Sequence, residues 1–320
     1  MATDTEAGTP SPDDAFAVLG DETRIAILRT LGEADDPLSF SELRDRVGVE
    51  DSGGFNYHLD RLRDHFVRRT EEGYDLRGAG RRVVEAVLSG TVTESPTIEH
   101  TEIDVPCQFC GAPIVVGFRE ERVESYCTEC RGLFGRDCCV DGPDAPEGGY
   151  LGYLPIPPAG VEGRDPEELY RAAWTWANLE IMSMAAGVCP RCSATVEYSV
   201  DVCGNHDPGG TVCGECDRRK AVGLHVDCTN CIFDVGGTIN IGLVANTDLL
   251  AFLTEHGLNP VAPEAVAAVN RVHDAFEEEV VSEEPFEARF TFGLEGDTLT
   301  LTVDEDLEVR RGEGGDGAPE

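Results

Sequence analysis

The amino-acid sequence predicts an α+β protein: an N-terminal helical domain, then β modules held by metal, then a small helix and hairpin part. Three observations carry this prediction. Residues 13–90 lack cysteine and repeat their apolar residues at helical spacing. Residues 100–235 contain all 13 cysteines. Residues 236–310 return to helical and alternating apolar patterns, and the 320-residue chain is long enough for two or three domains.

The N-terminal domain is predicted to begin with short capped helices. Asp21 can cap a helix whose apolar residues recur at helical spacing. Ser39 and Glu42 form a capping-box pattern at the next helix, and Gly48 ends it. These signals place two helix starts before residue 50.

A third capped segment completes the pattern. Asp51 or Ser52 can cap it, and four apolar residues form a single stripe: Phe55, Leu59, Leu62 and Phe66. Two short helices joined by a glycine turn match a helix-turn-helix. Residues 67–76 predict a hairpin and residues 78–90 a closing helix. Residues 13–90 are therefore predicted to form a winged helix-turn-helix.

Four segments carry a resemblance to a known family, namely VLGDETRIAILRTL, FSELRDRVGV, SGGFNYHLDRL and the hairpin VRRTEEGYDL. In this order they resemble the winged helix-turn-helix of ArsR-type transcription regulators, in the form common in haloarchaea. The resemblance implies a homodimer that binds double-stranded DNA with its second motif helix in the major groove. The metal-sensing members carry cysteines where residues 41–60 have none, so sensing by that route is not expected.

The predicted recognition helix presents an outward face of small and polar residues: Ser52, Gly53, Gly54, Asn56, Tyr57 and Arg61. Asparagine can read adenine and arginine can read guanine, while helix N-terminal N–H groups suit phosphate. Four further arginines are candidates for phosphate contacts: Arg68, Arg69, Arg81 and Arg82. The alternative is an ordinary solvated helix face. His58 lies beside the apolar stripe and is predicted to be packed.

Charge limits the possible functions. The chain has 62 acidic and 25 basic residues, a formal charge of −37, and one lysine, Lys220. Such a chain repels polyanions at long range, which excludes a purely electrostatic nucleic-acid coat protein. The near absence of lysine resembles the proteins of salt-accumulating halophiles. Residues 53–82 are an exception, with seven arginines against five acidic residues.

Cysteine spacing predicts zinc. Ten of the 13 cysteines form five CxxC pairs. Without a secretion signal or a thioredoxin-like context, such pairs indicate metal rather than disulfides or redox chemistry. Residues 100–140 are predicted to form a zinc ribbon whose four thiolates flank a hairpin: Cys107, Cys110, Cys127 and Cys130.

A second cysteine-rich module is predicted over residues 188–235. It supplies eight further candidate ligands: Cys189, Cys192, Cys203, His206, Cys213, Cys216, Cys228 and Cys231. Their pairing into two sites could be sequential, or interleaved as in a RING, although the spacing after His206 is long for a RING. A single zinc in this module, with one redundant pair of ligands, is also possible. Together with the zinc of the first ribbon, this predicts two to three structural Zn²⁺ per chain. Cys138 and Cys139 are adjacent and predicted to be packed or free thiols.

Residues 141–187 are predicted to form a linker and then a helix capped by Asp165. The apolar stripe of this helix is expected to pack in the protein core, at a dimer seam or around an effector pocket. In the α/β C-terminal part, residues 239–258 predict a strand then a helix. Residues 263–276 predict a helix, and residues 286–309 a hairpin turning near Glu295. The tails, residues 1–12 and 311–320, are predicted to be disordered.

The sequence favours a DNA-binding transcription regulator with structural zinc over an enzyme. It contains no glycine-rich phosphate loop, nucleophile elbow or paired catalytic carboxylates. No apolar run approaches the roughly 18–20 residues of a membrane span, so a cytoplasmic protein is expected. The alternative function is a basal transcription or adaptor factor that joins a winged helix to zinc ribbons and uses the ribbons to contact the transcription machinery.

Overall fold

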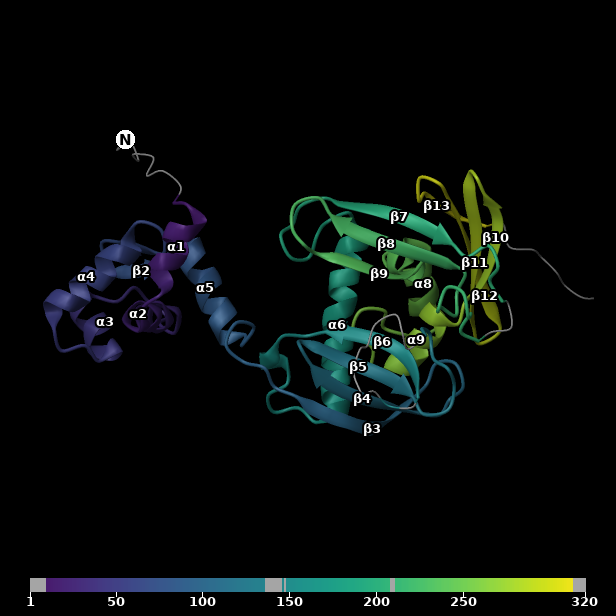
Figure 1. Ribbon diagram of the computed structural model, residues 1–320, viewed down its shortest axis with the longest axis horizontal. Helices are drawn as coiled ribbons and strands as arrows, with labels where there is room; N and C mark the ends of the chain where they lie inside the picture. The colour runs from purple at the N-terminus through teal and green to yellow at the C-terminus, as the bar shows by residue number, and fades with distance from the viewer. Residues whose placement is uncertain (1–9, 136–145, 147, 208–210, 313–320) are drawn as a thin grey trace, which may run out of the picture. The chain divides into compact units, whose positions relative to one another are not determined.

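The computed structural model describes residues 10–135, 146, 148–207 and 211–312. The chain divides into two compact units, Met1–Glu94 and Ser95–Glu320. The first is mainly helical and the second combines helices with three antiparallel sheets, so the fold is α+β (Figure 1). Most of both predicted disordered tails lies outside the described residues, but Ser11 caps the first helix.

Residues 10–94 of the first unit form five helices and one hairpin. The helices are α1 (Pro12–Leu19), α2 (Glu22–Gly32), α3 (Phe40–Val47), α4 (Ser52–Arg63) and α5 (Gly78–Leu88), and the strands are β1 (Val67–Arg69) and β2 (Tyr74–Leu76). In the hairpin Val67 pairs with Leu76, and the guanidinium carbon of Arg69 lies 5.9 Å from the centroid of the Tyr74 ring.

Helix starts in this unit follow the predicted caps. The Asp21 carboxylate accepts hydrogen bonds from the first backbone N–H groups of α2. Ser39 and Glu42 form both hydrogen bonds of a capping box at α3, which ends at Gly48 with a left-handed φ of 81°. Asp51, rather than Ser52, caps α4.

One apolar core holds α2, α3 and α4 against the hairpin and α5. Its fully buried side chains include Ile27, Leu43, Phe55, Leu59 and Leu62. The predicted stripe of α4 is therefore buried as expected. The opposite side of α4 is left at the surface, because one helix face fills the core.

The described part of the second unit forms three antiparallel sheets. The first is β3 (Ile98–Pro106), β4 (Pro113–Arg119), β5 (Arg122–Cys127) and β6 (Gly149–Pro155); the second is β7 (Val196–Val202), β8 (Val222–Cys228) and β9 (Asp234–Thr238); the third is β10 (Glu277–Glu283), β11 (Phe286–Leu294), β12 (Asp297–Asp304) and β13 (Val309–Arg311). The accompanying helices are η2 (Pro158–Gly160), α6 (Pro166–Ala185), α7 (Asn240–Leu243), α8 (Thr247–Glu255) and α9 (Val266–Asp274).

Helix α6 connects the two cores of this unit. Asp165 and Glu168 form a capping box at its start, with Pro166 at the first position. Trp174 packs in the core under the first sheet, whereas Met184 packs in the core shared by the other two sheets. Figure 1 shows the helix running from the first sheet to the second. The predicted apolar stripe thus forms core contacts at both ends.

Several features differ from the sequence predictions. The strand expected at the start of residues 239–258 is wrong, because Asn240–Leu243 forms a helical turn, α7. Strand β6 lies within the segment predicted as a linker, and β10 and β13 extend the predicted hairpin into a four-stranded sheet. Short apolar runs do not distinguish a buried strand from a helical turn.

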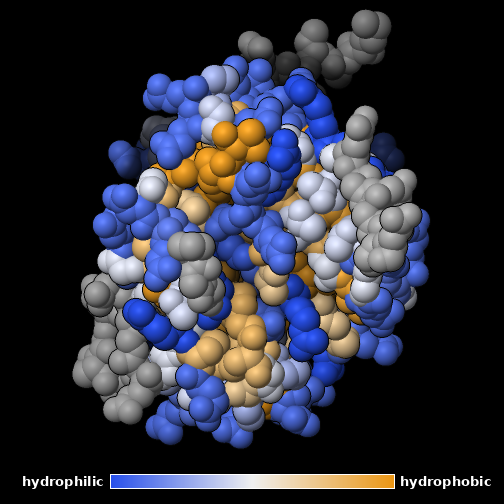
Figure 2. All heavy atoms as spheres, turned by 90° about the vertical axis from the view of Figure 1, so that its right-hand side faces the viewer, coloured by the Kyte–Doolittle hydropathy of each residue, from blue (hydrophilic) through white to orange (hydrophobic). Residues whose placement is uncertain are grey.

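The surface of the second unit is largely polar. Figure 2 shows a face dominated by hydrophilic side chains, with apolar side chains gathered in separate clusters. This agrees with the 62 acidic residues of the chain. None of the helices in the described ranges has the length and apolar character needed to cross a membrane.

Candidate metal centres and nucleic-acid interface

The first cysteine cluster forms at one end of the first sheet. Cys107 and Cys110 lie in the turn between β3 and β4, while Cys127 ends β5 and Cys130 follows it. Ile114 pairs with Cys127, which brings the two CxxC turns together. The sulfurs of Cys107 and Cys130 are 3.7 Å apart, and all four lie within 4.8 Å of one another. Four thiolates around a tetrahedral zinc would be about 3.8 Å apart, so the cluster could hold such an ion.

Backbone hydrogen bonds to sulfur support this interpretation. The N–H groups of Glu129 and Cys130 donate to Cys127 Sγ at 3.4 and 3.3 Å, and that of Gly132 donates to Cys130 Sγ at 3.4 Å. Gly132 has a φ of 76°, and a Cβ there would lie 2.1 Å from the Tyr150 carbonyl oxygen. Donors aimed at sulfur stabilise thiolates, which are the form that binds metal.

Two further clusters form at opposite ends of the second sheet. One contains Cys189, Cys192, Cys228 and Cys231, and the other contains Cys203, His206, Cys213 and Cys216. The pairing is therefore nested, neither sequential nor interleaved. The register of β7 and β8 explains this, because Val196 pairs with Cys228 at one end and Val202 with Val222 at the other. Each end of the hairpin gathers its own four ligands.

The second cluster contains a thiol that favours the ionised form. The N–H groups of Cys231 and Asn230 donate to Cys228 Sγ and lower the pKa of this thiol to about 6. The sulfurs of Cys192 and Cys228 lie 3.4 Å apart. A thiolate near neutral pH beside three further sulfurs is a ready metal ligand.

In the third cluster, both ring nitrogens of the histidine have neighbours that fix the orientation of the ring. His206 Nδ1 lies 3.5 Å from Cys216 Sγ, whereas Nε2 lies 3.2 Å from the carbonyl oxygen of Arg219. Metal-binding histidines commonly donate their second nitrogen to such an oxygen, which fixes the ring. All 11 cysteines in the described ranges belong to the three clusters. Cys138 and Cys139 lie outside the described residues.

Arg219 joins the first and third clusters. Its Nε donates to the Gly132 carbonyl at 2.8 Å, next to the first cluster. Its guanidinium carbon lies 4.2 Å from the centroid of the Phe109 ring, inside the Cys107–Cys110 turn. The backbone oxygen of the same residue meets His206. Arg219 therefore contacts residues of both sites.

The candidate base-reading residues lie on the exposed face of α4. The Tyr57 side chain is 60% exposed, and Asn56 and Arg61 are also exposed. Asn56 Nδ2 donates to the Asp60 carboxylate at 2.8 Å, which also accepts from Arg63 at 2.9 Å. This contact uses one N–H of the Asn56 amide, which leaves its second N–H and its Oδ1 for a base.

The N-terminus of α4 is already capped by its own chain. The N–H groups of Gly53 and Gly54 donate to the Asp51 carboxylate at 3.0 and 2.9 Å. A Cβ at Gly54 would lie 2.7 Å from an Asp51 oxygen, so capping accounts for this glycine. These two N–H groups are not open to a phosphate while Asp51 holds them. Ser52 is the exposed first residue of the helix.

Three of the four arginines predicted to contact phosphates have acidic partners in the first unit, whereas Arg69 lies over the Tyr74 ring. Arg68 Nε donates to Asp75 at 3.0 Å, and Arg81 lies 3.8 Å from the same carboxylate. Arg82 donates to Glu85 at 2.8 Å. Such exposed pairs contribute only about 0–1 kcal/mol, so a phosphate could replace the carboxylate at small cost.

Two family models match the chain. Residues 12–87 match a domain of unknown function, DUF7347, and residues 104–309 match another, DUF7351. The second match covers more than half of the 320 residues. The chain belongs to the DUF7351 family. No curated protein and no solved structure matches it.

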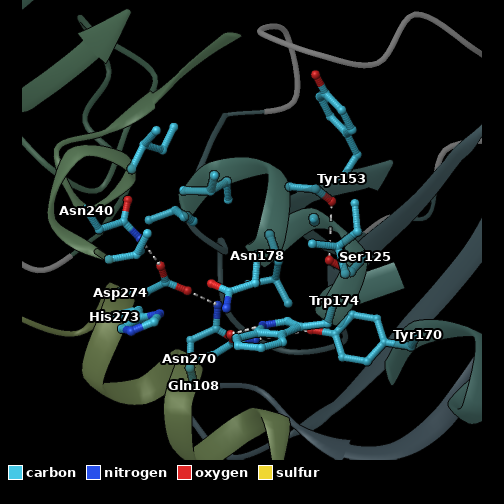
Figure 3. Close-up of a pocket in the computed structure, with 18 residues that line it drawn as sticks. Gln108, Ser125, Tyr153, Tyr170, Trp174, Asn178, Asn240, Asn270, His273 and Asp274 are labelled. Carbon is cyan, nitrogen blue, oxygen red and sulfur yellow. Dashed lines mark hydrogen bonds between the residues drawn. The ribbon is translucent and has the colours of Figure 1, made fainter. Parts of the chain in front are cut away.

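The DUF7351 part also contains polar residues that sequence reasoning missed. Asn178 and Asn270 lie on the apolar faces of α6 and α9, and both line a cavity with Asp274 (Figure 3). Asn178 is 4% exposed. A signal was present, because an amide within an apolar helical stripe must find a partner inside the protein.

Proposed function

We propose that the chain is a sequence-specific DNA-binding transcription regulator. In this proposal the first unit is a winged helix-turn-helix that resembles ArsR-type regulators, with α4 as the recognition helix and β1–β2 as the wing. The observation that carries it is the division of α4 into two faces. Phe55, Leu59 and Leu62 fix the helix in the core, while Asn56, Tyr57 and Arg61 remain exposed. Such a helix can present side chains to base edges in a major groove.

Charge distribution supports the proposal. Residues 53–82 carry seven arginines and five acidic residues in a chain of net charge −37. An acidic chain gains little from long-range attraction to DNA, so its affinity must come from this local stretch and from base contacts. Binding through close contacts is compatible with concentrated salt, where the Debye length is only about 3 Å.

A homodimer fits the exposed apolar residues of the first unit. Phe16 on α1 is 73% exposed, and Leu88 at the end of α5 is 54% exposed. Apolar side chains this exposed are suited to contact with a second copy. Two copies related by a two-fold axis would read a near-palindromic site with half-sites about one helical turn apart.

We further propose that the three clusters bind structural Zn²⁺. Each offers four ligands within 4.8 Å of one another, which completes a tetrahedral shell without a position for a reacting water. Such an ion would hold the strand ends together where apolar side chains are few. This arrangement supports a non-enzymatic role, because catalytic zinc keeps an open coordination position.

Zinc content provides a direct test of the metal proposal. We expect three zinc ions per chain, because three complete tetrads are available. Cys110→Ser and Cys192→Ser alter exposed ligands of separate clusters, so each variant should lose one zinc. Inductively coupled plasma mass spectrometry of the purified protein measures this. A well-folded chain that contains no zinc would rule out structural metal.

The second candidate function is a basal transcription or adaptor factor. It is favoured by a groove of about 750 Å³ on the outer side of α6, where the exposed Trp176 and Leu179 could contact a protein partner. Genome-wide chromatin occupancy separates the candidates. A regulator is expected at a limited set of operators that share one sequence. Occupancy that follows polymerase across all promoters would instead support the adaptor, and the absence of enrichment on DNA would contradict both.

A further inference from the structure

A polar cavity that contains none of the candidate metal ligands lies inside the second unit. Its volume is about 140 Å³, and it lies where α6 and α9 meet the first sheet and α7. Figure 3 shows Asn240, Asp274 and His273 on one side of this space and Trp174 and Tyr170 on the other, with Asn178 between them. Apolar walls come from residues such as Leu151, Leu154 and Ile181. The cavity thus combines an apolar surround with a dense set of amides.

Most of the polar lining is fixed by internal hydrogen bonds. The Asp274 carboxylate accepts from Gln108 Nε2 at 2.9 Å and from Asn240 Nδ2 at 3.1 Å. Trp174 Nε1 donates to Asn270 Oδ1 at 2.6 Å, and Asn270 Nδ2 donates to the Tyr170 hydroxyl oxygen at 3.2 Å. Side chains held in this way are preorganised and need little rearrangement to receive a ligand.

Two groups keep unused hydrogen-bonding capacity. His273 is 6% exposed, and its buried Nε2 has no hydrogen-bond partner among the described residues. Asn178 Nδ2 donates to the Pro260 carbonyl at 3.0 Å, and Oδ1 of the same amide is the acceptor atom that it offers to a ligand. A buried polar group without a partner is costly, so a ligand that satisfies His273 Nε2 gains from that contact.

We propose that this cavity binds a small uncharged ring compound with an adjacent hydrogen-bond donor and acceptor, of the cyclic amide or single-ring nucleobase class. His273 Nε2 and Asn178 Oδ1 contact the polar edge of the ligand, and its ring lies among the apolar side chains. A cavity of about 150 Å³ is known to hold benzene, so 140 Å³ suits one six-membered ring. This inference does not depend on DNA binding.

The charges around the cavity disfavour an anionic ligand. Neither lysine nor arginine lines it in the described ranges, so an anion would find no counter-charge. Burial raises the pKa of Asp274 to about 7 despite the hydrogen bond from Gln108 and the charge of Lys220. Burial also lowers the pKa of His273 to about 4, which leaves this imidazole neutral at pH 7.

The first cysteine cluster supports one wall of the cavity. Gln108 lies between Cys107 and Cys110 and holds Asp274 through its side-chain amide. Loss of metal from that cluster would displace this wall. The binding experiment therefore uses the full, zinc-loaded chain.

The test compares uracil with benzene by isothermal titration calorimetry. Uracil has the size and the adjacent donor and acceptor that the site requires, whereas benzene has the size alone. We expect saturable 1:1 binding of uracil that is stronger than any binding of benzene. His273→Phe and Asn178→Leu preserve approximate volume and should each weaken uracil binding about tenfold. Leu179→Ala is the control, because Leu179 lies exposed on α6 outside the cavity.

A fluorescence measurement avoids any change to the cavity. The chain has two tryptophans, so Trp176→Phe leaves Trp174, which lines the cavity, as the single reporter. Titration with 5-bromouracil should quench Trp174 saturably, and uracil should reverse the quenching. Absence of uracil binding and of saturable quenching means that the cavity holds water alone and overturns the proposal. Equal binding of benzene, or unchanged affinity in folded His273 and Asn178 variants, also contradicts it.

Discussion

Removal of metal from the full chain is expected to unfold residues 95–320 while residues 1–94 keep their helices. Each structural zinc contributes an apparent free energy of about 10–16 kcal/mol at pH 7, which equals or exceeds the usual 5–15 kcal/mol of total stability. The three clusters close the ends of two sheets in the second unit, whereas the first unit contains no cysteine. Circular dichroism during titration with a strong chelator measures the change.

The near-ultraviolet circular dichroism of tryptophan makes this experiment specific to the second unit. Both tryptophans, Trp174 and Trp176, lie in the second unit. Their signal should disappear on chelation and return when zinc is added back, while part of the far-ultraviolet helix signal persists. Calcium added back at the same concentration is the control, because thiolate clusters select zinc over hard cations. Tryptophan signals that survive complete zinc removal would contradict a structural role for the metal.

The second large effect is expected at α4. Asn56→Ala or Arg61→Ala should each cost about 1–3 kcal/mol of binding to the preferred duplex and relax specificity at one base position. The reason is that each side chain can make a bidentate contact with one base. Binding titrations in concentrated KCl, with duplexes altered at single positions, measure both effects.

Phosphate contacts should behave differently from base contacts. Arg68→Ala or Arg81→Ala removes a charge that no base reads, so affinity should fall for all duplexes by a similar factor. Glu33→Ala is a matched control, because Glu33 is an exposed residue following α2. If Asn56→Ala and Arg61→Ala also weaken all duplexes equally, α4 does not read sequence.

The features predictable from the sequence are those set by neighbouring residues. The caps at Asp21 and Ser39 depend on side chains that reach backbone groups two or three residues away. The five CxxC turns are also local, and each contributes to a cluster. Helix caps and periodic apolar stripes are both local patterns, and together they predict most of the helices in the first unit.

Nested ligand pairing could not be predicted, because it depends on strand register. Val196 pairs with Cys228, which is 32 positions further along the chain, and that pairing brings Cys189 to Cys231. The cavity was missed for a related reason. Gln108 and Asp274 are 166 positions apart, and their contact follows from the packing of a sheet against α9. Strand β6 was missed because Gly149 and Gly152 weaken the alternating pattern.

Selection from randomised duplexes tests directly whether α4 reads a DNA sequence. The full, zinc-loaded chain is incubated with a random duplex library in concentrated KCl, and the bound fraction is sequenced through several rounds. We expect one enriched near-palindromic sequence with half-sites about one helical turn apart, and a changed preference at single positions for Asn56→Ala and Arg61→Ala. No enriched sequence, or the same enriched sequence from both variants, would contradict DNA recognition by α4.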